Sequence, residues 1–407
     1  MPRILVAGGG AAGYFAAIRA REVCSRVEVA LFESLSRPLG KVKISGGGRC
    51  NVTHHCFDAG RLVGFYPRGG RALRGVFERC GPLDVARWFE SRGVRLKTEE
   101  DGRMFPITDS SQTIIDCLER EAARAGVQVA LRRGLRAARR TAGGFTVDFG
   151  GVEERGDALL LATGSNDAGY ACVVALGHGL VRPVPSLFTF KVADPRLEGL
   201  AGVSVPRVVG RLVVPEHPPV VQEGPLLVTH WGLSGPVVLR LSAWGARALH
   251  EVGYQATLLV DFFPDTGQEQ VRATLFEAKA RSRKHAGNDC PWDFPRRLWE
   301  SLLRHAGGDP EAAWPALPNK VLNRLAEELK RGSFRVSGKG AFKEEFVTAG
   351  GVPLDEVDLR TMESRCCPGL YLAGEILDVD ALTGGFNFQN AWSTGWIAGS
   401  AAAESLR

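Results

Sequence analysis

The sequence contains no long hydrophobic run. Its first residues, MPRILVAGGG, hold only a short apolar stretch from Ile4 to Ala7 before glycine interrupts it. A secretory signal needs a longer apolar segment, and a membrane-spanning helix needs about 20 apolar residues. We therefore expect a cytoplasmic protein with no signal peptide and no membrane partner.

The sequence also lacks the short motifs of several enzyme classes. No histidine or cysteine cluster has the spacing of a metal site, and there is no nucleophile elbow and no Walker motif. The nine cysteines include no CxxC pair, and the adjacent Cys366 and Cys367 have a spacing that rarely forms a disulfide. Such scattered thiols are typical of a reducing compartment, and we expect no metal ion.

Acidic residues are slightly outnumbered by basic ones, with 45 Asp and Glu against 51 Lys and Arg and a formal net charge of +6. The most concentrated basic run consists of Arg132, Arg133, Arg136, Arg139 and Arg140. This excess fits the binding of an anion, such as cofactor phosphate, NADPH or nucleic acid. It fits an ordinary solvated surface equally well, so charge alone decides no function.

Glycine, in contrast, is abundant, with 50 residues that gather in clusters. Gly8, Gly10 and Gly13 form a G-x-G-x-x-G turn between an apolar run and the helix-forming stretch that starts with Ala11 and Ala12. The first glycine permits the turn, the second lets the backbone reach a pyrophosphate, and the third lets the helix pack on the strand. The diphosphate then lies on the amino terminus of the helix. This turn predicts a dinucleotide-binding site.

The identity of the dinucleotide follows from three later strand ends. Glu33 ends the second apolar run, where an acid accepts hydrogen bonds from ribose hydroxyls and repels the extra phosphate of NADP. FAD or NAD remain. An extended FAD crosses several strand ends, and two more carry suitable residues, namely Ala162, Thr163 and Gly164 at one and Gly374, Glu375 and Asp380 at the other. We therefore predict FAD.

A glycine pair precedes the last predicted helix, residues 390–404. Gly385, Phe386 and Asn387 lie at the start of this helix, and a helix amino terminus aimed at the flavin pyrimidine ring would stabilise the charge of the reduced flavin. We assign these three residues to cofactor binding. The alternative is an ordinary glycine-rich loop before a helix.

The segment SGGGRCN, residues 45–51, is the most unusual in the chain. Successive glycines, Gly47 and Gly48 among them, can present consecutive N–H groups to an anion. Arg49 would reach a phosphate or a substrate anion, and Asn51 would hydrogen-bond the flavin. Cys50 is a candidate thiol acid near flavin N5, and a packed, inert thiol is the alternative.

His230, in the segment THWGLSGP, is the best-placed histidine of the middle region. It would donate a proton to the reduced substrate or bind it. A histidine with a purely structural place in the core or in a loop is the alternative.

The pattern of elements predicts an α/β protein with a Rossmann-type FAD-binding domain of the glutathione-reductase kind. We place its first part at residues 1–186 and its second part at 347–407. Short β-rich runs place an inserted, barrel-like β domain at 187–265 and 333–346, and helix-like runs place a helical subdomain at 266–332.

Several motifs resemble one known family, the BaiN/YhiN-type flavoproteins, also described as aminoacetone oxidase family FAD-binding enzymes. They include GGGAAG, SGGGRCNVTH, RMFP, THWGLSGP, VTAGGV, TMES and GEILDVDALTGGFNFQNAW, and they run nearly from end to end. Ser165, Phe388 and Asn390 depart from the usual pattern, which puts the shape of the flavin pocket in doubt. The resemblance implies an FAD-binding fold with an inserted β domain and a helical portion. We also assign Lys41 and Leu135 to cofactor binding.

The resemblance implies an FAD-dependent oxidoreductase, and our leading hypothesis is a reductase. NAD(P)H, bound transiently, would reduce the flavin, and hydride would pass from flavin N5 to an unsaturated substrate. A branch of the family is associated with reduction of a uridine of large-subunit ribosomal RNA to dihydrouridine, which requires a flipped base and a basic surface. The alternatives are an amine oxidase acting on small molecules such as aminoacetone, and an RNA- or protein-binding module that keeps FAD without turnover.

Overall fold

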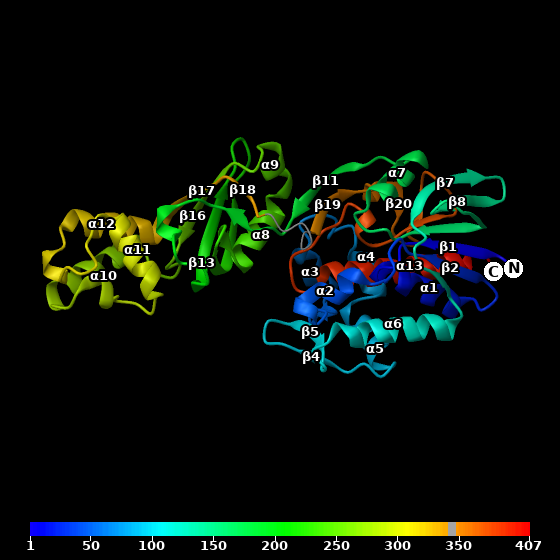
Figure 1. Ribbon diagram of the computed structural model, residues 1–407, viewed down its shortest axis with the longest axis horizontal. Coiled ribbons are helices and arrows are strands. Elements are labelled where there is room, and N and C mark those ends of the chain that lie inside the picture. Colours follow the sequence, from blue (N-terminus) through cyan, green and yellow to red (C-terminus); the bar gives the residue numbers. More distant parts are fainter. Residues whose placement is uncertain (341–346) are drawn as a thin grey trace. The chain divides into compact units, whose positions relative to one another are not determined.

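The chain forms two compact units, which the computed structural model describes over residues 1–340 and 347–407 (Figure 1). Unit 1 comprises Met1–Pro183 and Thr348–Arg407, and unit 2 comprises Val184–Val347. The last six residues of the predicted range 333–346 lie outside the described residues. The chain passes between the units through β11 (Val181–Ser186) and β19 (Val347–Gly351).

Unit 1 is built on a seven-stranded sheet in the order β20-β21-β22-β10-β1-β2-β6. The strands from β22 to β6 are parallel, and β20 and β21 add an antiparallel edge. Their bounds are β1 Arg3–Ala7, β2 Glu28–Phe32, β6 Gln128–Ala130, β10 Ala158–Leu161, β20 Val357–Asp358, β21 Glu363–Ser364 and β22 Leu370–Leu372. The central strands are continuous apolar runs because both faces of the sheet are covered.

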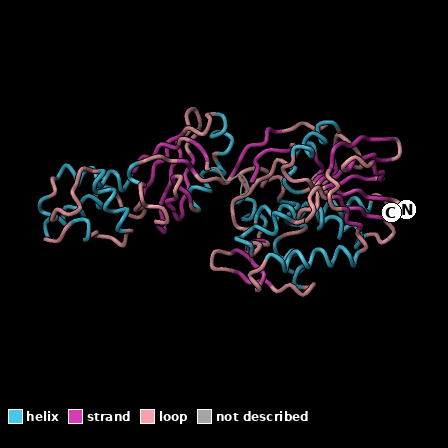
Figure 2. The backbone as a smooth tube through the Cα atoms, in the orientation of Figure 1, coloured by secondary structure: helices cyan, strands magenta, loops and turns pink. Residues whose placement is uncertain are grey.

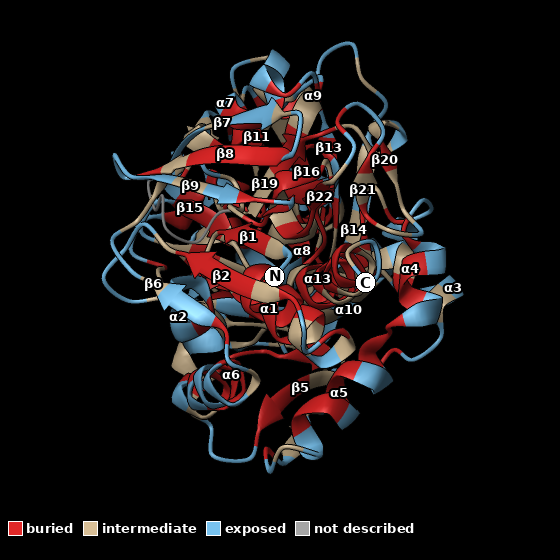
Figure 3. Ribbon diagram, turned by 90° about the vertical axis from the view of Figure 1, so that its right-hand side faces the viewer, coloured by how far each residue is buried: buried red, intermediate tan, exposed pale blue. Residues whose placement is uncertain are grey.

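One face of this sheet is covered by helices and the other by a small sheet (Figure 3). Helices α1 (Ala11–Val23) and α13 (Phe386–Glu404) pack on the first face. The second face carries the antiparallel strands β7 (Leu135–Thr141), β8 (Gly144–Phe149) and β9 (Glu153–Gly156), with α7 (Asp167–Ala175) against β7. Strands β1, β2 and β8 are largely buried between these layers.

Helices α1 and α13 approach each other closely through two glycines of α13. A Cβ atom at Gly395 would lie 2.6 Å from the carbonyl oxygen of Ala12, and one at Gly399 would lie 2.2 Å from that of Ala16. Only glycine fits at these two positions. The start of α1 is thus held in place by the last helix of the chain.

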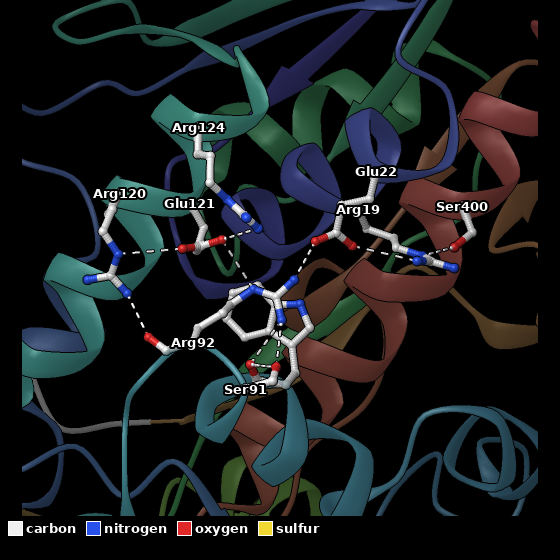
Figure 4. A network of polar contacts seen from close by, with 9 residues as sticks. Arg19, Glu22, Ser91, Arg92, Arg120, Glu121, Arg124 and Ser400 are labelled. Carbon is white, nitrogen blue, oxygen red and sulfur yellow. Dashed lines mark hydrogen bonds and ion pairs between the residues drawn. The ribbon is translucent and has the colours of Figure 1, made fainter.

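The remaining elements of unit 1 surround this core. They are α2 Gly40–Gly48, β3 Thr53–His54, α3 Ala59–Leu62, η1 Val63–Phe65, α4 Arg74–Arg79, α5 Pro82–Glu90, β4 Leu96–Thr98, β5 Arg103–Pro106, α6 Ser111–Ala125, η5 Leu354–Glu356 and η6 Gly374–Ile376. An arginine-rich network joins α1, α5, α6 and α13 (Figure 4). In it, Arg92 bridges Glu22 of α1 at 2.6 Å and the buried Glu121 of α6 at 3.3 Å.

Unit 2 contains one antiparallel sheet in the order β17-β16-β13-β14-β15-β12-β18 (Figure 2). The bounds are β12 Phe190–Lys191, β13 Ser204–Val213, β14 Val220–Thr229, β15 Gly232–Ser234, β16 Ala256–Asp261, β17 Gly332–Val336 and β18 Gly338–Lys339. The two outermost strands, β17 and β18, are separated in the chain by Ser337 alone. The sheet therefore curls back on itself, as a barrel-like domain does.

Helices complete unit 2. The predicted helical region contains α10 (Gln268–Arg281), α11 (Arg296–His305) and α12 (Asn319–Arg331), and these pack around the buried Trp299 and Trp314. The helices α8 (Pro236–Trp244) and α9 (Ala246–Glu251) lie within the region that the sequence predicted to be β-rich. Within the described residues, no helix is both long and apolar enough to cross a membrane.

Candidate FAD-binding site

The turn after β1 shows why each of its glycines is needed. Gly8 has φ +110°, and a Cβ atom there would lie 2.3 Å from the carbonyl oxygen of Ala162. A Cβ atom at Gly13 would lie 1.9 Å from the carbonyl oxygen of Gly8. At Gly10 a Cβ atom would meet nothing within 4 Å. Gly8 and Gly13 thus hold the fold together, while Gly10 leaves open the space in front of Ala11 and Ala12 at the start of α1.

Glu33 directly follows β2 and is tied to this turn. Its Oε2 atom accepts a hydrogen bond from the N–H of Gly9 at 2.8 Å, and its Oε1 atom accepts one from the N–H of Leu35 at 2.8 Å. The side chain is half-buried. The Oε1 atom also accepts from the hydroxyl of Ser34 at 2.9 Å, whereas Oε2 retains a lone pair and can still accept a hydrogen bond from a ribose hydroxyl.

Leu135 begins β7 beside the same strand end. The residues just before it, Arg132 and Arg133, donate backbone hydrogen bonds to the carbonyls of Leu35 and Glu33 at 3.1 and 2.7 Å. Leu135 itself is half-buried. The structure therefore places Leu135 close in space to the loop that carries Glu33.

Two further strand ends meet the turn. The amide of Ala162 binds the carbonyl of Ala7 at 2.9 Å, and the amide of Ala373 binds that of Leu161 at 3.0 Å. Gly164 and Gly374 have φ values of +63° and +77°. The ends of β1, β10 and β22 thus lie along one edge of the sheet.

Polar side chains gather at this edge. Lys41 and Glu375 form an ion pair, in which the lysine is well exposed and the glutamate largely buried. The hydroxyl of Thr163 is buried and has no hydrogen-bond partner within the described part of the chain. A buried hydroxyl without a partner is costly, and a bound polar group removes that cost.

The glycine-rich segment forms a row of left-handed residues at the end of α2. Gly46, Gly47 and Gly48 have φ values of +57°, +68° and +84°. Among the described residues, a Cβ atom at Gly47 or Gly48 would meet nothing within 4 Å, whereas one at Gly46 would lie 2.9 Å from the ring of Phe105. Gly47 and Gly48 therefore expose their backbone to open space, which suits the close approach of a ligand.

Arg49 turns toward other protein groups. Its Nη1 atom lies 2.6 Å from a carboxylate oxygen of Glu99 and 3.6 Å from one of Asp109, and its guanidinium stacks on Phe105. The hydrogen bond to Glu99 raises the pKa of Arg49 further. These acids lie about 50 and 60 residues along the chain from Arg49, so no local motif predicts the pairing.

Cys50 is fully buried. Burial raises the pKa of its thiol to about 12, although a hydrogen bond to Ser45 acts in the opposite direction. The residue has φ +60°, and its amide binds the carbonyl of Ser45 at 3.0 Å. A thiol in this environment stays protonated and inaccessible, which favours the packed alternative.

Asn51 joins the glycine-rich segment to the start of α13. Its amide donates to the carbonyl of Thr53 at 3.0 Å and accepts from the N–H of Gly385 at 2.9 Å. Gly385, with φ +90°, begins the helix, and a Cβ atom there would lie 2.6 Å from the carbonyl oxygen of Thr53. The helix starts four residues before the predicted Asn390, because this glycine turn admits Phe386 directly into the first turn.

The neighbours of α13 hold its amino terminus firmly. Asn387 bonds both the N–H and the carbonyl of Ala381 at 3.0 Å, and the carbonyl of Phe386 accepts from the hydroxyl of Tyr66 at 2.6 Å. Asp380 is fully buried and pairs with Arg68. Asn387 and Asp380 therefore position the loop before the helix.

His230 lies in unit 2, at the turn between β14 and β15. It is exposed, as is its neighbour Trp231 with 52% of its surface accessible. The turn is fixed by a hydrogen bond from the amide of Val192 to the carbonyl of Trp231 at 3.0 Å. The structure makes His230 accessible to a ligand.

Sequence reasoning missed two groups of this site. The hydroxyl of Thr394 accepts from the N–H of Gly374 at 2.9 Å, and the side chain of Gln389 bonds Thr53 at 2.5 Å. Both lie on the buried face of α13. Two features of the sequence could have indicated them. Polar residues interrupt an otherwise apolar helix, and the four-residue spacing of Gly395 and Gly399 indicates a helix face that packs closely on another segment.

The residues present fit FAD. Neither α1 nor α13 has a side-chain cap at its amino terminus, so their first N–H groups are available to an anion. Gly10, Gly47 and Gly48 leave open space, and Thr163 offers a hydroxyl without a partner in the described residues. This set suits a long ligand with phosphate and hydroxyl groups.

Comparison with known proteins decides the family. The family model described as "HI0933-like protein Rossmann domain" matches residues 2–401. The chain belongs to the HI0933-like family. The predicted family, the Rossmann-type FAD-binding fold and the class of FAD-dependent oxidoreductase are thereby confirmed.

Two relatives of the HI0933-like chain match along nearly their whole length. A 3-dehydro-bile acid delta(4,6)-reductase of Clostridium scindens is 31% identical over 99% of this chain and 100% of the relative. A ribosomal RNA dihydrouridine synthase of Escherichia coli is 30% identical over 96% of each chain. The crystal structure of a 3-ketosteroid-delta4-(5alpha)-dehydrogenase of Rhodococcus jostii has a TM-score of 0.51 at 16% identity, covering 98% of this chain and 96% of that one. This last likeness shows the fold alone.

Proposed function

We propose that the protein is an FAD-dependent reductase that takes electrons from NAD(P)H and reduces a carbon–carbon double bond in a uridine of large-subunit ribosomal RNA. The observation that carries this proposal is the full-length similarity to two relatives whose names both describe reductions. In the overall reaction, NAD(P)H gives up a hydride and the double bond gains a hydride and a proton. The products are NAD(P)⁺ and dihydrouridine.

The residues of unit 1 hold the cofactor in this proposal. The N–H groups at the start of α1 would bind the pyrophosphate, Glu33 would accept from the ribose, and the start of α13 would lie near the flavin. When bound, FAD would supply hydride transfer. The positive end of α13 would stabilise negative charge placed near it.

The proton comes from His230 rather than Cys50 in this proposal. His230 is exposed on a rigid turn, whereas the Cys50 thiol is buried with a pKa of about 12. A thiol with so high a pKa gives up its proton poorly near neutral pH, which counts against Cys50 as the general acid. A His230→Gln variant tests this role, because slower product formation with unchanged RNA binding supports it, and an unchanged rate would contradict it.

An arginine-rich surface of unit 1 supports RNA as the substrate. A hollow of about 420 Å³ is lined by Arg19, Arg79, Arg360 and Trp396, and its lining includes one carboxylate, that of Glu404. Arg79 donates to the carbonyl of Arg360, and it has no carboxylate partner within the described residues. Such uncompensated charge attracts phosphate groups.

Arg19 lines this hollow and also belongs to the polar network around α1, where it pairs with Glu22 at 3.5 Å (Figure 4). Its guanidinium lies over the ring of Trp396 at 3.9 Å. Beyond Glu22, the buried Glu121 is surrounded by Arg92, Arg120 and Arg124. Arginines therefore outnumber carboxylates along this face, which supports contact with an RNA backbone.

A charge reversal tests the surface. Arg79→Glu should weaken binding of ribosomal RNA. It should also reduce the slope of log binding constant against log salt concentration by about one, which corresponds to one released ion. Arg281, exposed in unit 2 and paired with Glu277, supplies the control variant Arg281→Glu. Equal RNA affinities of the two variants would remove this surface from the proposal.

A second candidate substrate is a small ring compound with a conjugated double bond. The similarity to the bile acid reductase over the full chain favours it. Ribosomal RNA from a deletion strain distinguishes the two. A missing dihydrouridine that returns with the gene supports the RNA substrate, whereas an unchanged modification map leaves the small molecule.

The electron donor is tested separately. The sequence has no second G-x-G-x-x-G turn, so the nicotinamide binds transiently in this proposal. Anaerobic mixing with NADPH and with NADH should bleach the flavin for at least one of them. If neither does so, another donor replaces NAD(P)H.

A further inference from the structure

A histidine, a glutamate and a cysteine that are distant in the sequence meet in unit 1. His178 follows α7, Glu356 ends η5, and Cys366 follows β21. The Nδ1 atom of His178 lies 2.7 Å from Oε2 of Glu356, and the Sγ atom of Cys366 lies 3.9 Å from the same oxygen. One ligand atom of each residue lies within 4.8 Å of the other two.

A second set of contacts fixes the orientation of these side chains. The side chain of His178 is fully buried, and its Nε2 atom lies 2.7 Å from the hydroxyl of Ser364. That hydroxyl oxygen also accepts from the amides of Cys366 and Cys367 at 3.1 and 2.8 Å. The amide of Gly179 donates to Glu356 at 3.0 Å. Ser364 is thus placed like the outer-sphere partner that orients a metal-binding histidine.

We propose that His178, Glu356 and Cys366 bind a divalent metal ion of the zinc type. Nitrogen, oxygen and sulfur form a common ligand set for zinc, and three protein ligands leave a fourth position for water. The site is independent of the cofactor and of the proposed reaction. No sequence motif predicts the site, because its three ligands come from distant segments of the chain.

The geometry requires only small movements. In a tetrahedral site with bonds of about 2.0–2.3 Å, the nitrogen and oxygen would lie about 3.4 Å apart and the sulfur about 3.6 Å from either. His178 and Glu356 must therefore separate slightly, and Cys366 must move inward. Cys366 is exposed and Glu356 partly so, which leaves a path for the ion and its water.

The charges are also suitable. The negatively charged Glu356 and Asp355 lie near the Cys366 side chain. A dication neutralises this negative field and stabilises the thiolate. On binding, the thiol proton goes to solvent, and the neutral imidazole keeps its one proton on Nε2, which faces the Ser364 hydroxyl at 2.7 Å. No oxidation or reduction is involved.

The consequence of binding is a link between the two parts of the chain that build unit 1. His178 belongs to the first part, and Glu356 and Cys366 belong to the second. An ion that binds only the folded site stabilises the fold in proportion to its concentration and affinity. We therefore expect this metal to raise the melting temperature of the protein.

Cobalt(II) is the probe that tests the site. It is added to the full-length, FAD-loaded protein under reducing conditions, and the spectrum of the metal-free protein is subtracted. We expect a thiolate-to-cobalt charge-transfer band that saturates at one ion per chain and that zinc abolishes. Cys366→Ser should lack this band, and the control Cys290→Ser in unit 2 should keep it.

A second variant covers the carboxylate. Glu356→Gln keeps an acceptor for His178, and it should weaken zinc binding by more than about 10-fold. Zinc should raise the melting temperature of the wild type but not that of Cys366→Ser. Absence of the charge-transfer band in the wild type, or a band that persists in Cys366→Ser, would overturn the proposal.

Discussion

The substitution Gly10→Ala separates the cofactor role of the glycine turn from its role in folding. Gly10 has an ordinary φ of −89°, and a Cβ atom there would meet no atom of residues 1–340 or 347–407 within 4 Å. The folded protein without FAD should therefore tolerate alanine, with no loss of stability. The new methyl group would, however, lie where the backbone approaches the pyrophosphate.

The expected effect on FAD affinity can be worked out. If the methyl group displaces the phosphate from a single N–H donor, one charge-assisted hydrogen bond is lost, which is worth about 1.5–3 kcal/mol. Every 1.4 kcal/mol changes the dissociation constant tenfold, so FAD should bind about 10- to 150-fold more weakly. Calorimetric titration of the cofactor-free protein with FAD measures this change.

Gly8→Ala is the matched comparison. Its φ of +110° and the 2.3 Å approach to Ala162 combine backbone strain with steric overlap. Each of these costs on the order of 1–3 kcal/mol, so this variant should lose about 2–6 kcal/mol of folding stability. The reasoning would be refuted if Gly10→Ala bound FAD as tightly as the wild type, or if it lost as much stability as Gly8→Ala.

Three further predictions concern buried groups of unit 1. In the folded protein at pH 8, an alkylating reagent should modify the exposed Cys366 and spare Cys50, whose pKa is about 12, and mass spectrometry of the peptides would show it. Asp380→Asn breaks a buried ion pair with Arg68 and should cost about 3–5 kcal/mol in urea unfolding, whereas Asp358→Asn at the surface should cost far less. Burial lowers the pKa of His54 below 6.5, so as the pH falls, His54 is protonated in the unfolded chain before it is protonated in the folded protein. The contribution of His54 to the free energy of unfolding should therefore be constant above about pH 6.5 and decrease at lower pH. His54→Gln should flatten this fall, and equal slopes would contradict the assignment.

Local signals allowed much of the FAD-binding unit to be predicted. The strand, turn and helix around Gly8 to Gly13 depend on neighbouring residues alone. The curled sheet of unit 2 was also predicted from its short apolar runs. Hydrophobic periodicity and capping residues predict such elements because they depend only on residues within one turn or one strand.

The parts that could not be predicted depend on contacts between distant segments. The pairing of Arg49 with Glu99 and Asp109 required the fold of 99–109 to be known. The link from Asn51 to Gly385 spans most of the chain. Helices α8 and α9 interrupt a region rich in β-forming residues, because burial of residues such as Val237 and Leu241 outweighs their local preference. Tertiary packing decided each of these features.

A single-turnover experiment tests the central claim most directly. The FAD-loaded protein is reduced anaerobically and mixed with ribosomal RNA from a strain that lacks the gene, and dihydrouridine is counted by mass spectrometry. We predict one dihydrouridine for each flavin that is reoxidised, and none with Gly10→Ala at an FAD concentration that leaves its site empty. Reoxidation of the flavin by this RNA without dihydrouridine, or no reoxidation at all, would contradict the claim that this protein reduces a uridine.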